Sequence, residues 1–204
     1  MIAPIRILLA DDEQLIRTAL AQLLELEDDL TVVAQAGSGD EAVAVARARE
    51  LDVAVLDLQM PGTDGISAAE QLLRIHPGCG VVIVTGHGRP GHLKRALTAG
   101  VRGFLPKTTS AATLAAVVRS VHAGGRYVDP ELSAEAIAAG DSPLTPREAD
   151  VLELAADGAP VDEIARRASL SPGTVRNYLS SAVTKLGAAN RHDAAATARR
   201  LGWI

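Results

Sequence analysis

The chain has 204 residues, 48% of them hydrophobic and 22% charged, so it is long enough for two small domains and is not disordered by composition. Its four aromatic residues are too few for a protein that stacks single-stranded bases on aromatic side chains, and its one cysteine, Cys79, excludes a disulfide framework. The net charge of −5 by itself argues against a nucleic-acid partner, but from Ser171 to the end of the chain five basic residues accompany a single acidic one.

Short aliphatic runs alternate with helical patterns through the first 122 residues. The expected strands are residues 5–10, 30–36, 53–56, 80–85 and 102–105, and the helices that follow them are residues 13–26, 39–50, 65–76, 90–99 and 110–123. This alternation predicts βαβ units, and the almost continuously apolar strands are typical of a sheet covered on both faces. We therefore expect an α/β domain at residues 1–123, with a doubly wound (βα)5 parallel sheet of the flavodoxin type.

Residues 124–142 have the composition of a linker. Gly124 and Gly125 end the α/β pattern, and an acidic stretch with room for a short helix at residues 130–139 follows. Beyond it, Thr145 and Ser171 each precede a proline, which pairs an N-cap residue with proline at the first helical position. Residues 143–204 are therefore expected to form a small all-α domain, with helices at residues 146–157, 161–168, 172–186 and 191–201.

Polar residues stand where the strands of the first domain end. Asp11 and Asp12 follow the first strand, Asp57 the third, Thr85 ends the fourth and Lys107 follows the fifth, so all five should meet at one edge of a parallel sheet. Three carboxylates repel one another unless a cation joins them, and oxygen ligands suit Mg²⁺. An ionised Asp57 could then attack a phosphoryl group. Each residue alone could be a solvated strand end, but the full set disfavours that interpretation.

These residues give residues 4–123 a specific resemblance to the receiver domains of two-component response regulators, through LLADD at 8–12, LDLQMPGTDG at 56–65, VTG at 84–86 and GFLPK at 103–107. The resemblance implies that Asp57 is the phospho-acceptor and that Asp12 binds Mg²⁺ directly, with Asp11 beside it. It further implies a metal ligand in the backbone carbonyl of Gln59, a phosphoryl contact from Lys107, and a switch pair in Thr85 and Phe104. It also implies that Asp64 caps the next helix.

The third helix of the second domain carries an unusual polar face. A short turn precedes it, apolar residues recur along one side, and the other side presents Arg176, Asn177, Ser180 and Lys185 without any acid. Such side chains can bind base edges and phosphates, so the helix suits the major groove of DNA. The alternative is a solvated amphipathic helix with no ligand.

Residues 144–204 resemble the LuxR/NarL-type helix-turn-helix domain, through LTPRE at 144–148, EIA at 163–165, SPGTVRNYL at 171–179 and KLG at 185–187. The resemblance implies that Thr174, Arg176, Asn177 and Ser180 belong to the DNA-binding surface. It places Lys185 near a phosphate and makes Glu148 a helix-pairing acid. On this basis Arg176→Ala should relax base preference, whereas Lys185→Ala should weaken binding uniformly. The sequence around Thr174 resembles that of a branch of this family that is linked to membrane-lipid or cell-envelope control.

Together the two resemblances predict a NarL/LuxR-type response regulator that a sensor histidine kinase phosphorylates on Asp57, and that then dimerises on double-stranded DNA. No small-molecule substrate, membrane span or signal peptide is expected, so the protein should act in the cytoplasm and not as an enzyme. Two alternatives stay open. One is an aspartyl-phosphate hydrolase, although Gln59 stands where such enzymes generally need a second acid. The other is a DNA-binding regulator whose receiver serves only as a dimerisation scaffold.

Overall fold

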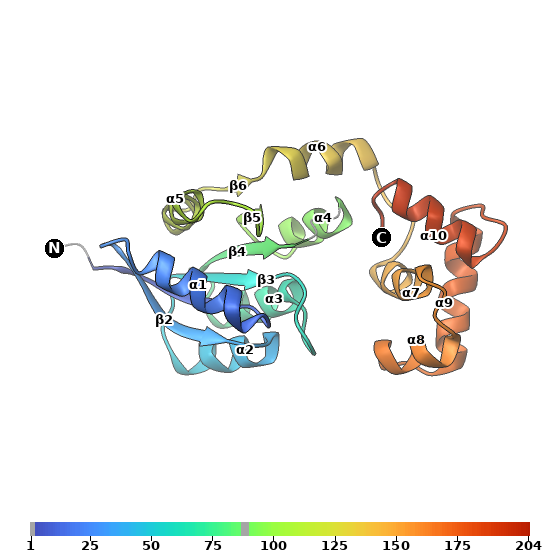
Figure 1. The fold of residues 1–204 in the computed structure, drawn as a ribbon, viewed down its shortest axis with the longest axis horizontal. Coiled ribbons are helices and arrows are strands. Elements are labelled where there is room, and N and C mark those ends of the chain that lie inside the picture. The colour runs from blue at the N-terminus through green and yellow to red at the C-terminus, as the bar shows by residue number, and fades with distance from the viewer. Residues whose placement is uncertain (1–2, 87–89) are drawn as a thin grey trace. The chain divides into compact units, whose positions relative to one another are not determined.

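A computed structural model describes residues 3–86 and 90–204, and its chain forms two compact units, one within residues 1–132 and the other built mainly from residues 133–204 (Figure 1). The first unit is built on a parallel sheet with strand order β2-β1-β3-β4-β5-β6. Its strands are β1 (Ile5–Ala10), β2 (Leu30–Ala36), β3 (Val53–Asp57), β4 (Gly80–Thr85), β5 (Gly103–Pro106) and β6 (Tyr127–Val128). The first five strands lie within one residue of their predicted positions.

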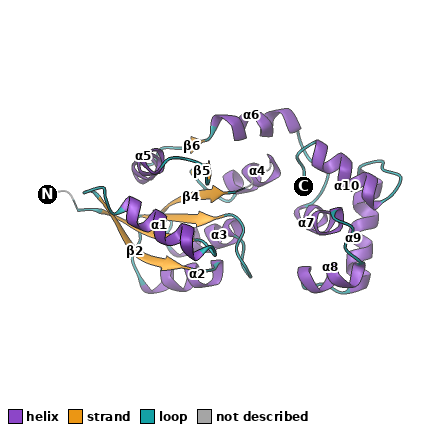
Figure 2. Ribbon diagram, in the orientation of Figure 1, coloured by secondary structure: helices purple, strands orange, loops and turns teal. Residues whose placement is uncertain are grey.

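Helices cover both faces of this sheet (Figure 2). They are α1 (Gln14–Leu24), α2 (Gly39–Ala48), α3 (Gly65–Ile75), α4 (Pro90–Thr98) and α5 (Ala111–His122). Helix α1 packs against α5 on one face, and α2 packs against α3 on the other. Leu24 of α1 and Val118 of α5 join Ile7, Val55 and Val82 of the strands in one buried cluster. The predicted doubly wound α/β fold is therefore confirmed.

The segment predicted as a linker contains more structure than expected. Within residues 124–142 the chain forms β6 and then α6 (Pro130–Ala139), so the sheet has six strands rather than five. The backbone N–H of Tyr127 donates to the carbonyl of Arg102 at 2.8 Å, and that of Asp129 donates to Phe104 at 3.0 Å. Strand β6 forms here because the backbone groups at the outer edge of β5 would otherwise lack partners. The short helix at residues 130–139 is confirmed.

The second unit contains α7 (Pro146–Ala156), α8 (Val161–Ala168), α9 (Pro172–Lys185) and α10 (Arg191–Arg200), all close to their predicted bounds. Thr145 and Glu148 form a capping box at the start of α7, and the Ser171 hydroxyl accepts from the backbone N–H of Thr174 at the start of α9. The core joins apolar residues from all four helices, among them Leu152, Ile164, Val175 and Ala198. Within residues 3–86 and 90–204, no helix is both long and apolar enough to span a membrane.

Candidate functional site

Three carboxylates meet at the carboxyl edge of β1 and β3. Asp11, Asp12 and Asp57 each offer an oxygen, and these oxygens all lie within 4.8 Å of one another. Asp11 and Asp57 are nearly buried, with exposed fractions of 2% and 5%, whereas Asp12 is open to solvent. A set of carboxylate oxygens with one side open to water fits Mg²⁺, which binds proteins through oxygen and keeps some of its waters.

Lys107 brings an ammonium group into this cluster. Its Nζ lies 3.0 Å from Oδ2 of Asp57, 2.8 Å from Oδ2 of Asp11 and 2.9 Å from Oε1 of Glu13. The backbone fixes its position, because the Lys107 N–H donates to the carbonyl of Thr85 at 2.7 Å. The sequence argument placed Lys107 at this edge but missed Glu13, whose contact spans 94 positions of the chain.

Burial and the neighbouring charges together shift the pKa values of Asp57 and Lys107. Burial raises the pKa of Asp57 above its ordinary value, and the neighbouring Asp11 adds to the rise, while Lys107 and the backbone N–H of Gln59 oppose it. Burial alone would lower the pKa of Lys107, but its bonds to Asp11, Glu13 and Asp57 raise it above the ordinary value. Lys107 is therefore a cation at neutral pH, and the carboxylates around it outnumber it.

The turn after β3 holds Asp57 in place. The backbone N–H of Leu58 donates to Val84 at 3.1 Å, and that of Gly65 donates to Leu58 at 3.0 Å. A Cβ on Gly65 would stand 2.0 Å from the carbonyl oxygen of Asp57, so only glycine permits this close approach. Asp64 caps α3 by accepting from the Ser67 N–H at 2.7 Å, as the sequence predicted.

Three further residues were predicted for this site, namely Thr85, Phe104 and Gln59. Thr85 ends β4 and is completely buried, and Phe104 on the adjacent β5 is completely buried as well. Gln59 follows β3 and is exposed. The structure thus brings Asp11, Asp12, Asp57 and Lys107 together, with Thr85 joined to Lys107 through the backbone.

In the second unit, α9 presents the predicted DNA-binding face. Arg176, Asn177 and Ser180 are exposed, and Thr174 is half-buried next to the capping hydroxyl of Ser171. Lys185 differs from them, because its Nζ lies 2.7 Å from Oε2 of Glu148 on α7. The family resemblance predicted Glu148 as a helix-pairing acid, but it did not identify Lys185, 37 positions away, as the partner.

Comparison with known families accounts for both units. Residues 7–119 match the response regulator receiver domain, and residues 142–198 match the luxR family of bacterial regulatory proteins. The two matches occupy separate stretches that together span most of the chain. The protein therefore belongs to the LuxR/NarL family of two-component response regulators, which are DNA-binding transcription regulators.

Full-length relatives share this organisation. The chain is 43% identical over 200 residues to the transcriptional regulatory protein DesR of Bacillus subtilis, covering 98% of this chain and 99% of DesR. It is 39% identical over 201 residues to UhpA of Escherichia coli, covering 98% and 100%. Among solved structures, the response regulator ChrA of a heme-sensing two-component system aligns over 100% of both chains, with 31% identity and a TM-score of 0.57. RcsB of Salmonella typhimurium, 24% identical with a TM-score of 0.77 over 98% and 100% of the chains, shares the fold.

Proposed function

We propose that this protein is a transcriptional response regulator that accepts a phosphoryl group on Asp57 from the phosphohistidine of a sensor kinase and then binds promoter DNA as a dimer. The observation that carries the proposal is the contact of Lys107 with Asp57 and Asp11 beside the exposed Asp12, in a chain that also carries a LuxR-type helix-turn-helix domain.

The residues of the cluster divide the chemistry among them. A carboxylate oxygen of Asp57 attacks phosphorus and the phosphorus–nitrogen bond of the donor breaks. The departing imidazole nitrogen keeps the bonding electron pair and takes a proton from water. Asp11, Asp12, Asp57 and the carbonyl of Gln59 would hold Mg²⁺, which supplies positive charge to the transferred oxygens. The Lys107 ammonium, 3.0 Å from Asp57, neutralises a further oxygen. The Thr85 hydroxyl donates to another.

Phosphorylation would then shift an equilibrium that exists in the free protein, because the phosphoryl oxygens add contacts to Lys107 and Thr85 in one state only. Phe104 beside Thr85 would move with it. In the favoured state two copies would dimerise and bind half-sites about one helical turn of DNA apart. We assign base and backbone contacts to Thr174, Arg176, Asn177 and Ser180.

The partners indicate where the protein acts, and the recognition helix indicates which genes it controls. Because the ligand is chromosomal DNA and the phosphoryl donor is a kinase domain, we place the protein in the cytoplasm. The sequence of the recognition helix around Thr174 favours promoters of membrane-lipid or cell-envelope genes. Footprinting across the genome, with the wild type and Asp57→Ala in parallel, tests this assignment, and bound promoters confined to unrelated genes would refute it.

Labelling with a small phosphoryl donor such as radioactive acetyl phosphate tests the chemistry. We expect Mg²⁺-dependent incorporation that approaches one phosphoryl group per chain, that disappears in Asp57→Ala, and that persists in Asp28→Ala, which removes an exposed acid outside the cluster. Continuous turnover of the donor would indicate the aspartyl-phosphate hydrolase instead. Absence of labelling would indicate a receiver that serves only as a dimerisation scaffold.

A further inference from the structure

Glu148 binds two residues of the recognition helix at once. Its Oε1 accepts from the Ser181 hydroxyl at 2.6 Å, and its Oε2 accepts from Nζ of Lys185 at 2.7 Å. Ser181 and Lys185 are four positions apart on α9, so they lie on the same side of that helix, one turn from each other. A single carboxylate on α7 therefore contacts α9 at two positions that are one helical turn apart.

The same carboxylate also closes the start of its own helix. Oε2 of Glu148 accepts from the backbone N–H of Thr145 at 2.7 Å, and the Thr145 hydroxyl accepts from the Glu148 N–H at 3.3 Å. Glu148 has an exposed fraction of only 5%, and its carboxylate accepts from the Thr145 N–H, the Ser181 hydroxyl and the Lys185 ammonium. A buried carboxylate with donors on both oxygens is held in one position, unlike a carboxylate that is solvated at the surface.

This attachment determines where the DNA-binding side chains stand. Arg176, Asn177 and Ser180 belong to the same helix as Ser181 and Lys185, so any rotation or shift of α9 moves them all together. Contacts at Ser181 and Lys185 resist both rotation of α9 about its axis and sliding along it. Base readout by hydrogen bonds is sensitive to displacements of this kind.

We infer that Lys185 acts on DNA binding through Glu148, as a positioning residue for α9, and that it does not neutralise a DNA phosphate. The inference rests on the proposed DNA-binding function and reverses the expectation that the family resemblance gave for Lys185. The ammonium group already has a buried partner at 2.7 Å, and turning it toward a phosphate would leave the Glu148 carboxylate buried without its cation.

The two roles differ in measurable ways. A lysine that binds a phosphate contributes about 0.9 to the slope of log K against log salt, and its loss weakens binding to every sequence alike. A positioning lysine contributes nothing to that slope, and its loss lowers the preference for the correct sequence. Glu148→Gln separates them further, because it frees the ammonium of Lys185 for a phosphate while it dismantles the attachment.

The experiment uses the full-length chain, treated with acetyl phosphate and Mg²⁺, and a duplex that the wild type enriches from a random-sequence pool. Affinity for this duplex and for a scrambled duplex is measured over a range of salt concentrations for wild type, Lys185→Ala and Glu148→Gln. Fluorescence of Trp203, the single tryptophan, reports whether the second unit is folded. The double variant Glu148→Gln/Lys185→Met serves if a single variant does not fold, because it leaves no unpaired charge behind.

We expect both single variants, and the double variant, to lose about tenfold or more of the ratio between selected and scrambled duplex, the cost of roughly one base pair misread, at an unchanged salt slope. A slope reduced by about 0.9 in Lys185→Ala with an unchanged ratio would overturn the inference alone, as would tighter binding by Glu148→Gln. Failure of the wild type to enrich any duplex would instead refute the proposed function, and the inference with it.

Discussion

Replacement of Lys107 by methionine removes the ammonium group that contacts Asp11, Glu13 and Asp57. Lys107 has an exposed fraction of 13% and lies 2.8 Å from Asp11 and 3.0 Å from Asp57, both nearly buried. At an effective dielectric constant near 20, each such pair carries about 6 kcal/mol of Coulomb attraction, which offsets the cost of burying the charges. Loss of one partner from a buried pair costs about 3–5 kcal/mol, which is the destabilisation that we expect for Lys107→Met at pH 7.

Urea unfolding followed by far-UV circular dichroism reports the helices of both units, and the transition that Trp203 fluorescence does not follow measures this change in the first unit. Trp203 packs against the core of the second unit, so its fluorescence gives an internal reference that Lys107→Met should leave unchanged. Mg²⁺ should recover part of the loss, about 2.7 kcal/mol at 100 times its dissociation constant, because it replaces the missing positive charge. The control is Arg126→Met, which removes an exposed cation.

Two results would refute this reasoning. If Lys107→Met were as stable as Arg126→Met without Mg²⁺, the contacts of Lys107 would contribute no net stability, as is common for exposed ion pairs. If Mg²⁺ stabilised neither the variant nor the wild type, the three aspartates would not form a cation site.

Three further changes test the supports of the two sites. Gly65→Ala should slow labelling of Asp57 and lower the urea midpoint of the first unit, because its Cβ would stand 2.0 Å from the Asp57 carbonyl oxygen; Gly78→Ala, with nothing within 4 Å, should change neither, and equal effects would contradict the steric argument. Burial raises the pKa of Glu148, but bonds from Lys185, Ser181 and Thr145 outweigh it and lower the pKa to about 2, against an ordinary 4.5. The second unit should therefore keep this contribution above pH 4.5 and lose about 3 kcal/mol as the pH falls to 2, seen in Trp203 fluorescence and absent in Glu148→Gln. Ser171→Ala should cost the second unit about 1 kcal/mol in urea unfolding through loss of the α9 N-cap, and an unchanged midpoint would contradict this.

Local patterns in the sequence were sufficient for most of the fold. Continuous apolar runs such as residues 80–85 identify buried strands, and N-cap residues such as Thr145 and Ser171 mark helix starts, because both signals arise from neighbours in the chain. The order of strands and helices then requires the carboxyl ends of the strands to meet at one edge. For that reason the sequence alone predicts that Asp11, Asp57 and Lys107 lie together.

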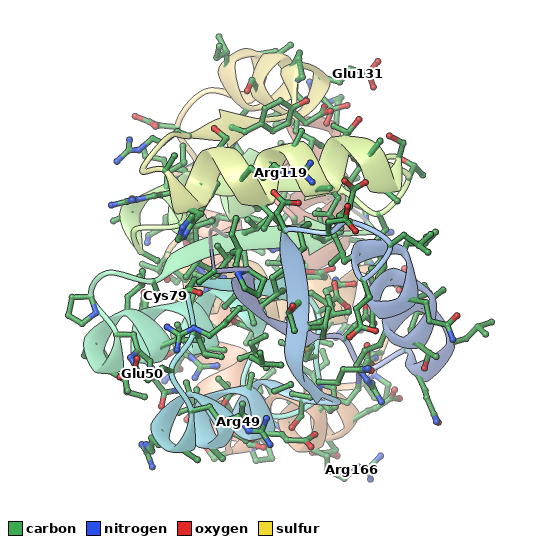
Figure 3. All side chains as sticks on the ribbon, turned by 90° about the vertical axis from the view of Figure 1, so that its left-hand side faces the viewer. Arg49, Glu50, Cys79, Arg119, Glu131 and Arg166 are labelled. Carbon is green, nitrogen blue, oxygen red and sulfur yellow. The ribbon has the colours of Figure 1, made fainter. Side chains whose placement is uncertain are left out.

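The features that the sequence did not reveal all depend on partners distant in the chain. Strand β6 is two residues long and has no alternating pattern, so only its pairing with β5 defines it. Arg119, on α5 in Figure 3, binds Asp29 at 2.6 Å and Glu27 at 2.7 Å, about ninety positions away. Charged residues of this kind are scattered along the whole chain, and composition or spacing cannot say which of them form pairs.

The balance of charge explains why two similar clusters should do different work. Each is a buried acid in contact with a lysine at 2.7–3.0 Å. Around Glu148 the single negative charge meets one ammonium, one hydroxyl and one backbone N–H, so the group is neutral in total and its acceptors are satisfied. Around Asp57 the acids outnumber the one lysine, and the excess negative charge can be reduced by a bound cation or by changing a carboxylate chemically. An unbalanced cluster is suited to binding and reaction, whereas a balanced one stabilises a fixed arrangement of helices.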